Sequence, residues 1–291
     1  MDPTTSMYVA QGIHGIAYGM ILFLIASGLN IIFGMMGILN MAHASFFMLA
    51  GYFCYQVIAI TGSFWAALFL APVFGAGAGI LMERIFLRKL HAFGHLGELI
   101  LTVGIGQVIL AFVKIFWGTE SLPVQVPPIL EGMVNFGGLE YPIYRLFVIG
   151  LALVVLVFMS LLLYKTRLGK IVRAAVSDRD MVNALGINIP VVFMFVFGIG
   201  TWLAGVAGVA IAPILTVFPG LADQVGMDAF IVVVTGGFGS LAGSFIVAII
   251  FGLLSSYGVQ FLSQLAPVLM VAFMAIVLAI RPNGLMGVEE K

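Results

Sequence analysis

The sequence predicts an all-α polytopic integral membrane protein, with a single transmembrane domain over residues 1–291. Hydrophobic residues make up 63% of the chain and charged residues 8%, whereas soluble domains carry about 25% charge. The mean hydropathy is +1.22, more apolar surface than a core of this size can bury, so lipid must be the solvent. Apolar runs of about 20 residues, enough to cross a bilayer, recur along the chain and predict about 8–9 crossings.

Six of these apolar runs are continuous and predict membrane spans directly. They are Tyr8–Gly28, Phe64–Leu87, Leu99–Trp117, Ile143–Tyr164, Pro190–Ala212 and Leu262–Ile280.

Two further apolar regions, Ile31–Ile60 and Asp228–Tyr257, are interrupted by glycines and polar residues. The first predicts one long span with a disordered entry, and the second predicts two short segments that meet at a glycine cluster. Each region follows the first span of one half of the chain, and the halves enter the membrane from opposite sides. Interrupted segments at matching positions of inverted-repeat-like halves indicate a substrate path.

The basic residues predict the orientation, because Lys and Arg favour cytoplasmic loops. Residues 83–98 and 165–189 carry Lys and Arg, whereas Gly118–Tyr141 carries none and holds three glutamates. This pattern places the N-terminus outside and the C-terminus in the cytoplasm. The C-terminal sidedness requires two crossings in Asp228–Tyr257.

Polar groups within the spans are the candidates for a translocation path, because their burial in hydrocarbon is costly unless they face a cavity or a partner. Asn40 and His43 lie three residues apart and share one helix face. An interhelical hydrogen bond explains them equally well, and helix packing explains the glycines equally well. The predicted path residues are Asn40, His43, Ser45, Thr102, Thr235, Gly236, Gly237, Gly239 and Ser240.

Two aspartates, Asp223 and Asp228, flank the entry to the second interrupted region. They could dock a partner, contact the ammonium group of a zwitterion, or be solvated at the surface. The spans otherwise contain almost no acids, which an ion-coupled carrier would need for protons or Na⁺.

The segment Lys165–Ile189 is the long polar interruption of the chain and holds five of its twelve Lys and Arg residues. Ser177 or Asp178 can cap a short helix, which Gly186 would end. Such an amphipathic helix suits a groove on a cytoplasmic partner, although a solvated connector is the alternative. The predicted coupling residues are Arg173, Ala174, Ala175, Asp178, Ala184 and Gly186.

The pattern A-A-x-x-D, ending at Gly186 before Pro190, resembles the coupling-loop signature of ABC-importer permeases, with Arg173 where the family usually has Glu. Three other stretches resemble signatures of the branched-chain amino-acid subfamily. They are Gly28–Tyr52, in which Ala44 replaces the usual Gly, Gly236–Leu254 and Arg281–Gly287. The resemblance covers nearly the whole chain.

The resemblance implies an inner-membrane permease subunit that translocates small hydrophobic, branched-chain amino acids and catalyses no reaction itself. It also implies a second permease, two cytoplasmic ATPases that hold ATP and Mg²⁺, and a periplasmic substrate-binding protein. The sequence has no P-loop, its single Cys54 excludes a cysteine-based metal site, and no basic stripe indicates nucleic acid. Alternatives are a related permease for urea, short amides or aromatic acids, or a stand-alone channel or secondary carrier.

Overall fold

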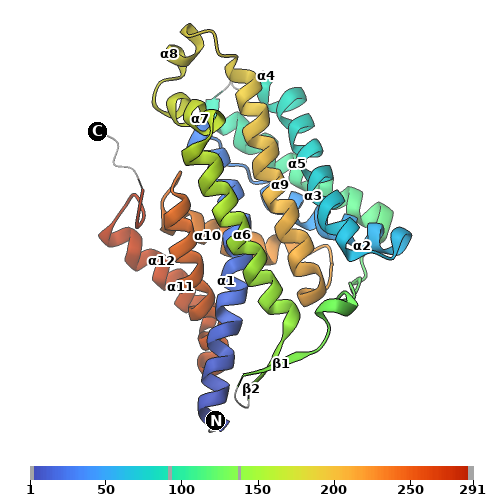
Figure 1. Cartoon of the computed structure of the whole chain (residues 1–291). Coiled ribbons are helices and arrows are strands. Elements are labelled where there is room, and N and C mark those ends of the chain that lie inside the picture. The colour runs from blue at the N-terminus through green and yellow to red at the C-terminus, as the bar shows by residue number, and fades with distance from the viewer. Residues whose placement is uncertain (1–2, 91–93, 137–138, 288–291) are drawn as a thin grey trace.

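The computed structural model describes residues 3–90, 94–136 and 139–287. They form a bundle of helices with one small hairpin, which confirms the all-α membrane fold (Figure 1). The long helices are α1 (Pro3–Met36), α2 (His43–Thr61), α3 (Phe64–Met82), α5 (Gly94–Trp117), α6 (Ile143–Lys165), α9 (Ile189–Leu215), α10 (Leu221–Gly236), α11 (Leu241–Leu262) and α12 (Ala266–Ile280). The short elements are α4 (Arg88–Leu90), α7 (Arg167–Ser177), α8 (Arg179–Ala184), β1 (Met133–Phe136) and β2 (Leu139–Pro142), with a π-helical turn at Glu83–Leu87 and a 3-10 turn at Pro128–Leu130.

Within the described residues, seven helices are long and apolar enough to cross a membrane. The helices α10 and α12 are shorter, at 16 and 15 residues, and a perpendicular crossing of the hydrocarbon needs about 20. The expected total of about 8–9 crossings therefore stays a prediction, as does the inverted-repeat relation of the two halves.

The first interrupted region differs from its expected bounds. The run Ile31–Met36 continues α1, and the helix ends where Gly37 takes a φ of 69° and its N–H bonds to the carbonyl of Phe33 at 2.8 Å. Gly34 lies within this run without a positive φ, so the helical hydrogen bonds continue past it to Gly37. A new helix, α2, begins at His43, and the expectation of one span over Ile31–Ile60 is corrected to two helices.

The core forms around α1, the most buried of the seven spans. This helix packs against α11, α9, α6, α10 and α2, and it runs through the centre of the molecule in Figure 1. Small residues let the neighbouring backbones approach closely, as is typical of membrane helix pairs. A Cβ added to Gly252 of α11 would lie 2.6 Å from the backbone nitrogen of Gly19.

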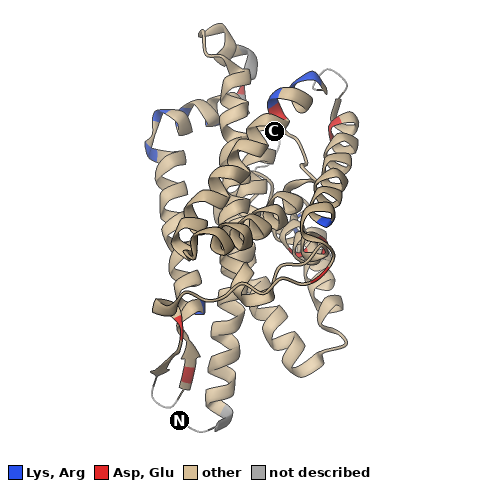
Figure 2. Cartoon of the chain, turned by 90° about the vertical axis from the view of Figure 1, so that its right-hand side faces the viewer, with Lys and Arg blue, Asp and Glu red and all other residues tan. Residues whose placement is uncertain are grey.

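The two ends of the bundle differ in their elements and in charge. The hairpin β1–β2 and the start of α1 lie at the lower end in Figure 1, and α7 and α8 lie at the upper end. Figure 2 shows two groups of Lys and Arg at that upper end, and acidic residues beside the hairpin. The charge asymmetry predicted for the loops is thus an asymmetry between two opposite ends of the fold.

Candidate functional site

The first break, between α1 and α2, is held by short polar contacts. The Oδ1 atom of Asn40 accepts the N–H of Ala42 at 3.1 Å, and Nε2 of His43 lies 3.1 Å from the carbonyl of Ile25. The Thr102 hydroxyl accepts the N–H of Met41 at 3.2 Å, which ties the break to α5. The structure therefore brings Asn40, His43 and Thr102 to one buried region, and Ser45 lies beside Gly106 of α5 in the same region.

The second break, between α10 and α11, is organised by Asn30 of α1. The side-chain amide of Asn30 donates to the carbonyl of Ser240 at 2.9 Å, the hydroxyl of Ser244 at 2.6 Å and the carbonyl of Gly237 at 3.3 Å. Its Oδ1 atom accepts the N–H of Gly239. One buried side chain thus accepts the N–H of Gly239 at the break and adds a second donor to the carbonyls of Gly237 and Ser240.

The C-terminal tail packs into the same break. The N–H of Leu285 donates to the carbonyl of Thr235 at 2.8 Å, and the N–H of Met286 donates to that of Gly236 at 3.1 Å. Gly237 has a φ of 99°, and a Cβ there would lie 2.6 Å from the Cα of Gly287. Gly237 is therefore required for close backbone packing in this structure, and a path-lining role for Thr235–Ser240 stays a prediction.

A separate cavity of about 520 Å³ lies in the other half of α1, between α1, α6, α9, α10 and α11. Its volume falls within the range of about 300–1,000 Å³ that is typical of small-molecule sites. One wall is apolar, and it is formed by Ile21, Ile211, Ile214, Leu215 and Val259. None of the predicted path residues lines this cavity.

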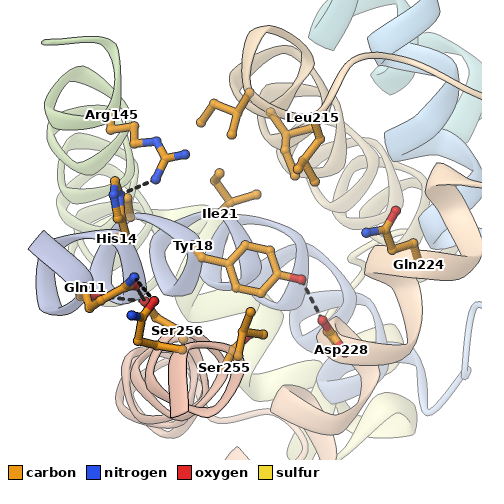
Figure 3. A pocket seen from close by; sticks show the side chains of 16 residues that line it. Gln11, His14, Tyr18, Ile21, Arg145, Leu215, Gln224, Asp228, Ser255 and Ser256 are labelled. Atoms are coloured by element: carbon orange, nitrogen blue, oxygen red, sulfur yellow. Dashed lines mark hydrogen bonds between the residues drawn. The ribbon is translucent and has the colours of Figure 1, made fainter. Parts of the chain in front are cut away.

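The charged groups of the cavity lie at two places, and Gln11, Ser256 and Gln260 form an uncharged polar group beside them (Figure 3). The hydroxyl of Tyr18 donates to Oδ2 of Asp228 at 2.6 Å. On the far side of Tyr18, the Nδ1 atom of His14 accepts from Arg145 and lies 3.0 Å from the Tyr141 hydroxyl. The cavity therefore carries a carboxylate and a guanidinium on opposite walls, with apolar residues between them.

Sequence reasoning gave Asp228 three possible roles, one of them contact with an ammonium group, but missed Tyr18, Arg145 and Asn30. Tyr18 and Asn30 lie in the continuous apolar run of α1, and their partners are about 210 residues away. A buried polar residue in an uninterrupted apolar span was the available signal, because such residues seldom occur without a partner.

The charged segment folds as two helices, α7 and α8. Thr166 caps α7 by accepting the N–H of Gly169 at 3.1 Å, and Asp178 caps α8 by accepting the N–H of Met181 at 2.9 Å. The capping of a short helix by Asp178 is thus confirmed by the geometry. Gly186 takes a φ of 81° just after α8 ends.

One of the predicted coupling residues of this segment is buried, and the others are exposed. Ala175 is fully buried against the core of the chain, whereas Arg173, Ala174, Asp178, Ala184 and Gly186 are exposed. Arg173 bonds to the carbonyl of Leu163, and its guanidinium lies 5.4 Å from the centre of the Tyr164 ring. These contacts join α7 to the end of α6.

Comparison with known proteins defines the class of this protein. Residues 13–280 match the family described as branched-chain amino acid transport system / permease component. The chain is 28% identical to the high-affinity branched-chain amino acid transport system permease protein BraD of Pseudomonas aeruginosa, over 99% of this chain and 98% of the relative. It is 26% identical to the permease protein LivH of Escherichia coli, over 97% of this chain and 96% of the relative.

The protein is therefore a multi-pass transport permease of the bacterial inner-membrane type. It belongs to the branched-chain amino acid transport system / permease component family, which confirms the resemblance seen in its motifs. It is also 25% identical to the permease protein LivM of Escherichia coli, over 92% of this chain and 68% of that relative. PsaBC from Streptococcus pneumoniae, solved in complex with a Fab, shares the fold with a TM-score of 0.52, at 11% identity over 93% of this chain and 91% of that chain.

The side chains of the site agree with membership of a permease family. Among the described residues no group of three or more His, Cys, Asp and Glu could hold a metal ion. The polar side chains of the cavity and the breaks can bind, orient and pack, which are the actions that a permease needs. The substrate path is formed by such groups in helical membrane transporters.

Proposed function

We propose that this chain is a membrane subunit of an ABC importer that translocates branched-chain and other small hydrophobic amino acids. The observation that supports this most strongly is the family match over residues 13–280, together with full-length relatives that are branched-chain amino acid permeases. A second permease of the same family, two ATPases and an external binding protein would complete the importer. The ATPases would carry ATP and Mg²⁺.

The surface of α8 supports an ATPase as the partner at the α7–α8 end. Met181 and Leu185 lie four residues apart and expose 58% and 72% of their surface, so they share one helix face. An exposed apolar pair on a short capped helix fits a groove in a soluble partner. Because α7 is joined to α6 and also contacts α1, a force on α8 reaches the core of the bundle.

Replacing Leu185 with Glu is expected to uncouple transport from ATP hydrolysis. The added charge would have to be buried in the proposed groove, which costs far more than the lost apolar contact. We expect the ATPase to co-purify at least about tenfold less well, which corresponds to about 1.4 kcal/mol or more. Co-purification from detergent and ATP-driven uptake measure the effect.

Leu185→Met is the matched control, because it keeps the apolar surface and the size of the side chain. Both variants should insert into the membrane equally well, since Leu185 is exposed in the folded chain. Normal co-purification and uptake in Leu185→Glu would show that α8 is not the coupling element.

The proposed orientation places the hairpin outside the cell and α8 in the cytoplasm. In a Cys54→Ala background, a cysteine at Glu131 should react with an impermeant thiol reagent applied to intact cells. A cysteine at Asp178 should react only after permeabilisation. Both positions are exposed, so labelling reports sidedness, and the reverse pattern would invert the charge-based topology.

The proposed function itself is tested by reconstitution of the chain with its partner permease, the ATPases and the binding protein in proteoliposomes. Leucine uptake should require ATP and all four components. Uptake by this chain alone, without ATP, would indicate a channel or secondary carrier, and uptake of urea or an aromatic acid in preference to leucine would assign a different substrate.

A further inference from the structure

The half-buried carboxyl group of Asp228 lines the cavity. Its hydrogen bond to the Tyr18 hydroxyl is a bond to a neutral group, and no cation contacts it among the described residues. Removing a carboxylate from water is costly unless a cation pairs with it. An ionisable residue at such a place in a membrane protein indicates a functional site, and a cationic ligand group would complete the pairing.

The rest of the cavity restricts the ligand. The apolar side chains of Ile21, Ile211, Ile214 and Leu215 line part of the cavity and favour an aliphatic group there. The uncharged polar side chains Gln11, Gln224, Ser255, Ser256 and Gln260 line the remainder, and Gln11 is hydrogen-bonded to both Ser256 and Gln260. At the opposite wall, Arg145 carries a positive charge and is bonded to the neutral acceptor nitrogen of His14. A ligand with an ammonium group, an aliphatic side chain and a carboxylate matches this arrangement of charges.

We propose that this cavity is a binding site for an aliphatic α-amino acid within the permease, and that Asp228 binds the ammonium group. Tyr18 is a positioning residue, because its hydroxyl holds Oδ2 of Asp228 and leaves the second carboxylate oxygen for the ligand. Arg145 provides the positive potential that orients the carboxylate of the ligand away from Asp228. The inference rests on the proposed function, and it adds the site and the group that recognises the substrate.

Substrate protection of a cysteine tests the site without ATP or a binding protein. Ser255 lines the cavity near Tyr18 and Asp228. The variant Ser255→Cys, in a Cys54→Ala background, is assembled into the full transporter in proteoliposomes and treated with a small thiosulfonate reagent. We expect excess leucine to slow the modification, and 4-methyl-2-oxopentanoate, which lacks the ammonium group, to leave the rate unchanged.

The variant Asp228→Asn keeps the shape of the side chain and its hydrogen bond to Tyr18 but removes the charge. We expect it to weaken the protection by leucine about tenfold or more, as the loss of a charge-assisted hydrogen bond does. Asp223→Asn is the matched control, because Asp223 lies on the same helix, is exposed and does not line the cavity. Asp228→Glu, which retains the charge, should keep part of the protection.

The outcomes distinguish failure of the proposed binding site from failure of the proposed transport function. Equal protection by leucine and the oxo acid, or full protection in an assembled Asp228→Asn variant, would overturn the site. Should Asp228→Asn fail to assemble, the comparison of leucine with the oxo acid on Ser255→Cys alone decides. ATP-driven leucine uptake is then measured in the same proteoliposomes after ATP and the binding protein are added, so uptake without protection refutes the site alone, and no uptake by the wild type refutes the proposed function.

Discussion

Replacing Asn30 with leucine is expected to prevent stable assembly of the bundle. The change strands the N–H of Gly239 and the hydroxyl of Ser244, and it removes one of two donors from the carbonyls of Gly237 and Ser240. Interhelical hydrogen bonds in membranes average only about 0.6 kcal/mol, but each buried group left unsatisfied costs about 1–3 kcal/mol. We therefore expect a loss of about 3 kcal/mol, measured as thermal unfolding of the purified protein in detergent.

Ser27→Ala provides the control for this experiment. Ser27 is buried on the same helix, one turn before Asn30, and its hydroxyl donates only to the carbonyl of Leu24 on its own helix at 2.9 Å. Its loss strands no group on α10 or α11, so the free energy of unfolding should change by less than about 1 kcal/mol. Equal effects of the two changes would show that Asn30 does not hold the break.

Replacing Gly252 with leucine is expected to force α1 and α11 apart. The added Cβ would lie 2.6 Å from the nitrogen and 2.7 Å from the Cα of Gly19. A side chain could rotate away, but a backbone in the centre of the bundle cannot, so the cost should exceed the usual overpacking penalty of about 1–3 kcal/mol. We expect little monodisperse protein after extraction, as measured by size-exclusion chromatography.

Gly77→Leu is the control that separates the effect of a close helix contact from the effect of replacing a glycine. Gly77 lies within α3, and a Cβ there meets no atom within 4 Å. The same substitution at this place should leave the yield of folded protein near that of the wild type, and it can stabilise the helix slightly because leucine has the better helix propensity. A normal yield from Gly252→Leu would mean that α1 and α11 do not pack through this contact.

Much of the fold could be predicted because each membrane-spanning segment must by itself be long and apolar enough to cross the lipid. A span needs about 20 apolar residues whatever it packs against, so α3, α5, α6 and α9 lie close to their predicted ranges. Caps are equally local, which is why the N-cap of α8 could be narrowed to Ser177 or Asp178, of which the structure uses Asp178. The exact end of α1 could not be found in this way, because Gly34 and Gly37 are both plausible breakers and only Gly37 takes a positive φ.

The cavity and the contacts of Asn30 could not be predicted, because they join residues that lie far apart in the sequence. Asp228 and Tyr18 are 210 residues apart, and Asn30 and Ser244 are 214 apart. No periodicity links such positions, since hydrophobic patterns report only which face of one helix is apolar. The predicted path residues near the breaks were recognised by their polarity, but polarity alone does not separate a cavity from a packed contact.

The central place of α1 has a consequence for biogenesis. This helix leaves the ribosome first, whereas α9 and α11, which pack against it, are made in about the last third of synthesis. At about 5–20 residues per second, roughly 10–40 seconds pass before the partners of Asn30 emerge. During that interval the nascent chain carries an unsatisfied amide within the membrane. Quality control that recognises exposed polar groups in spans would thus remove chains whose synthesis stops before α11.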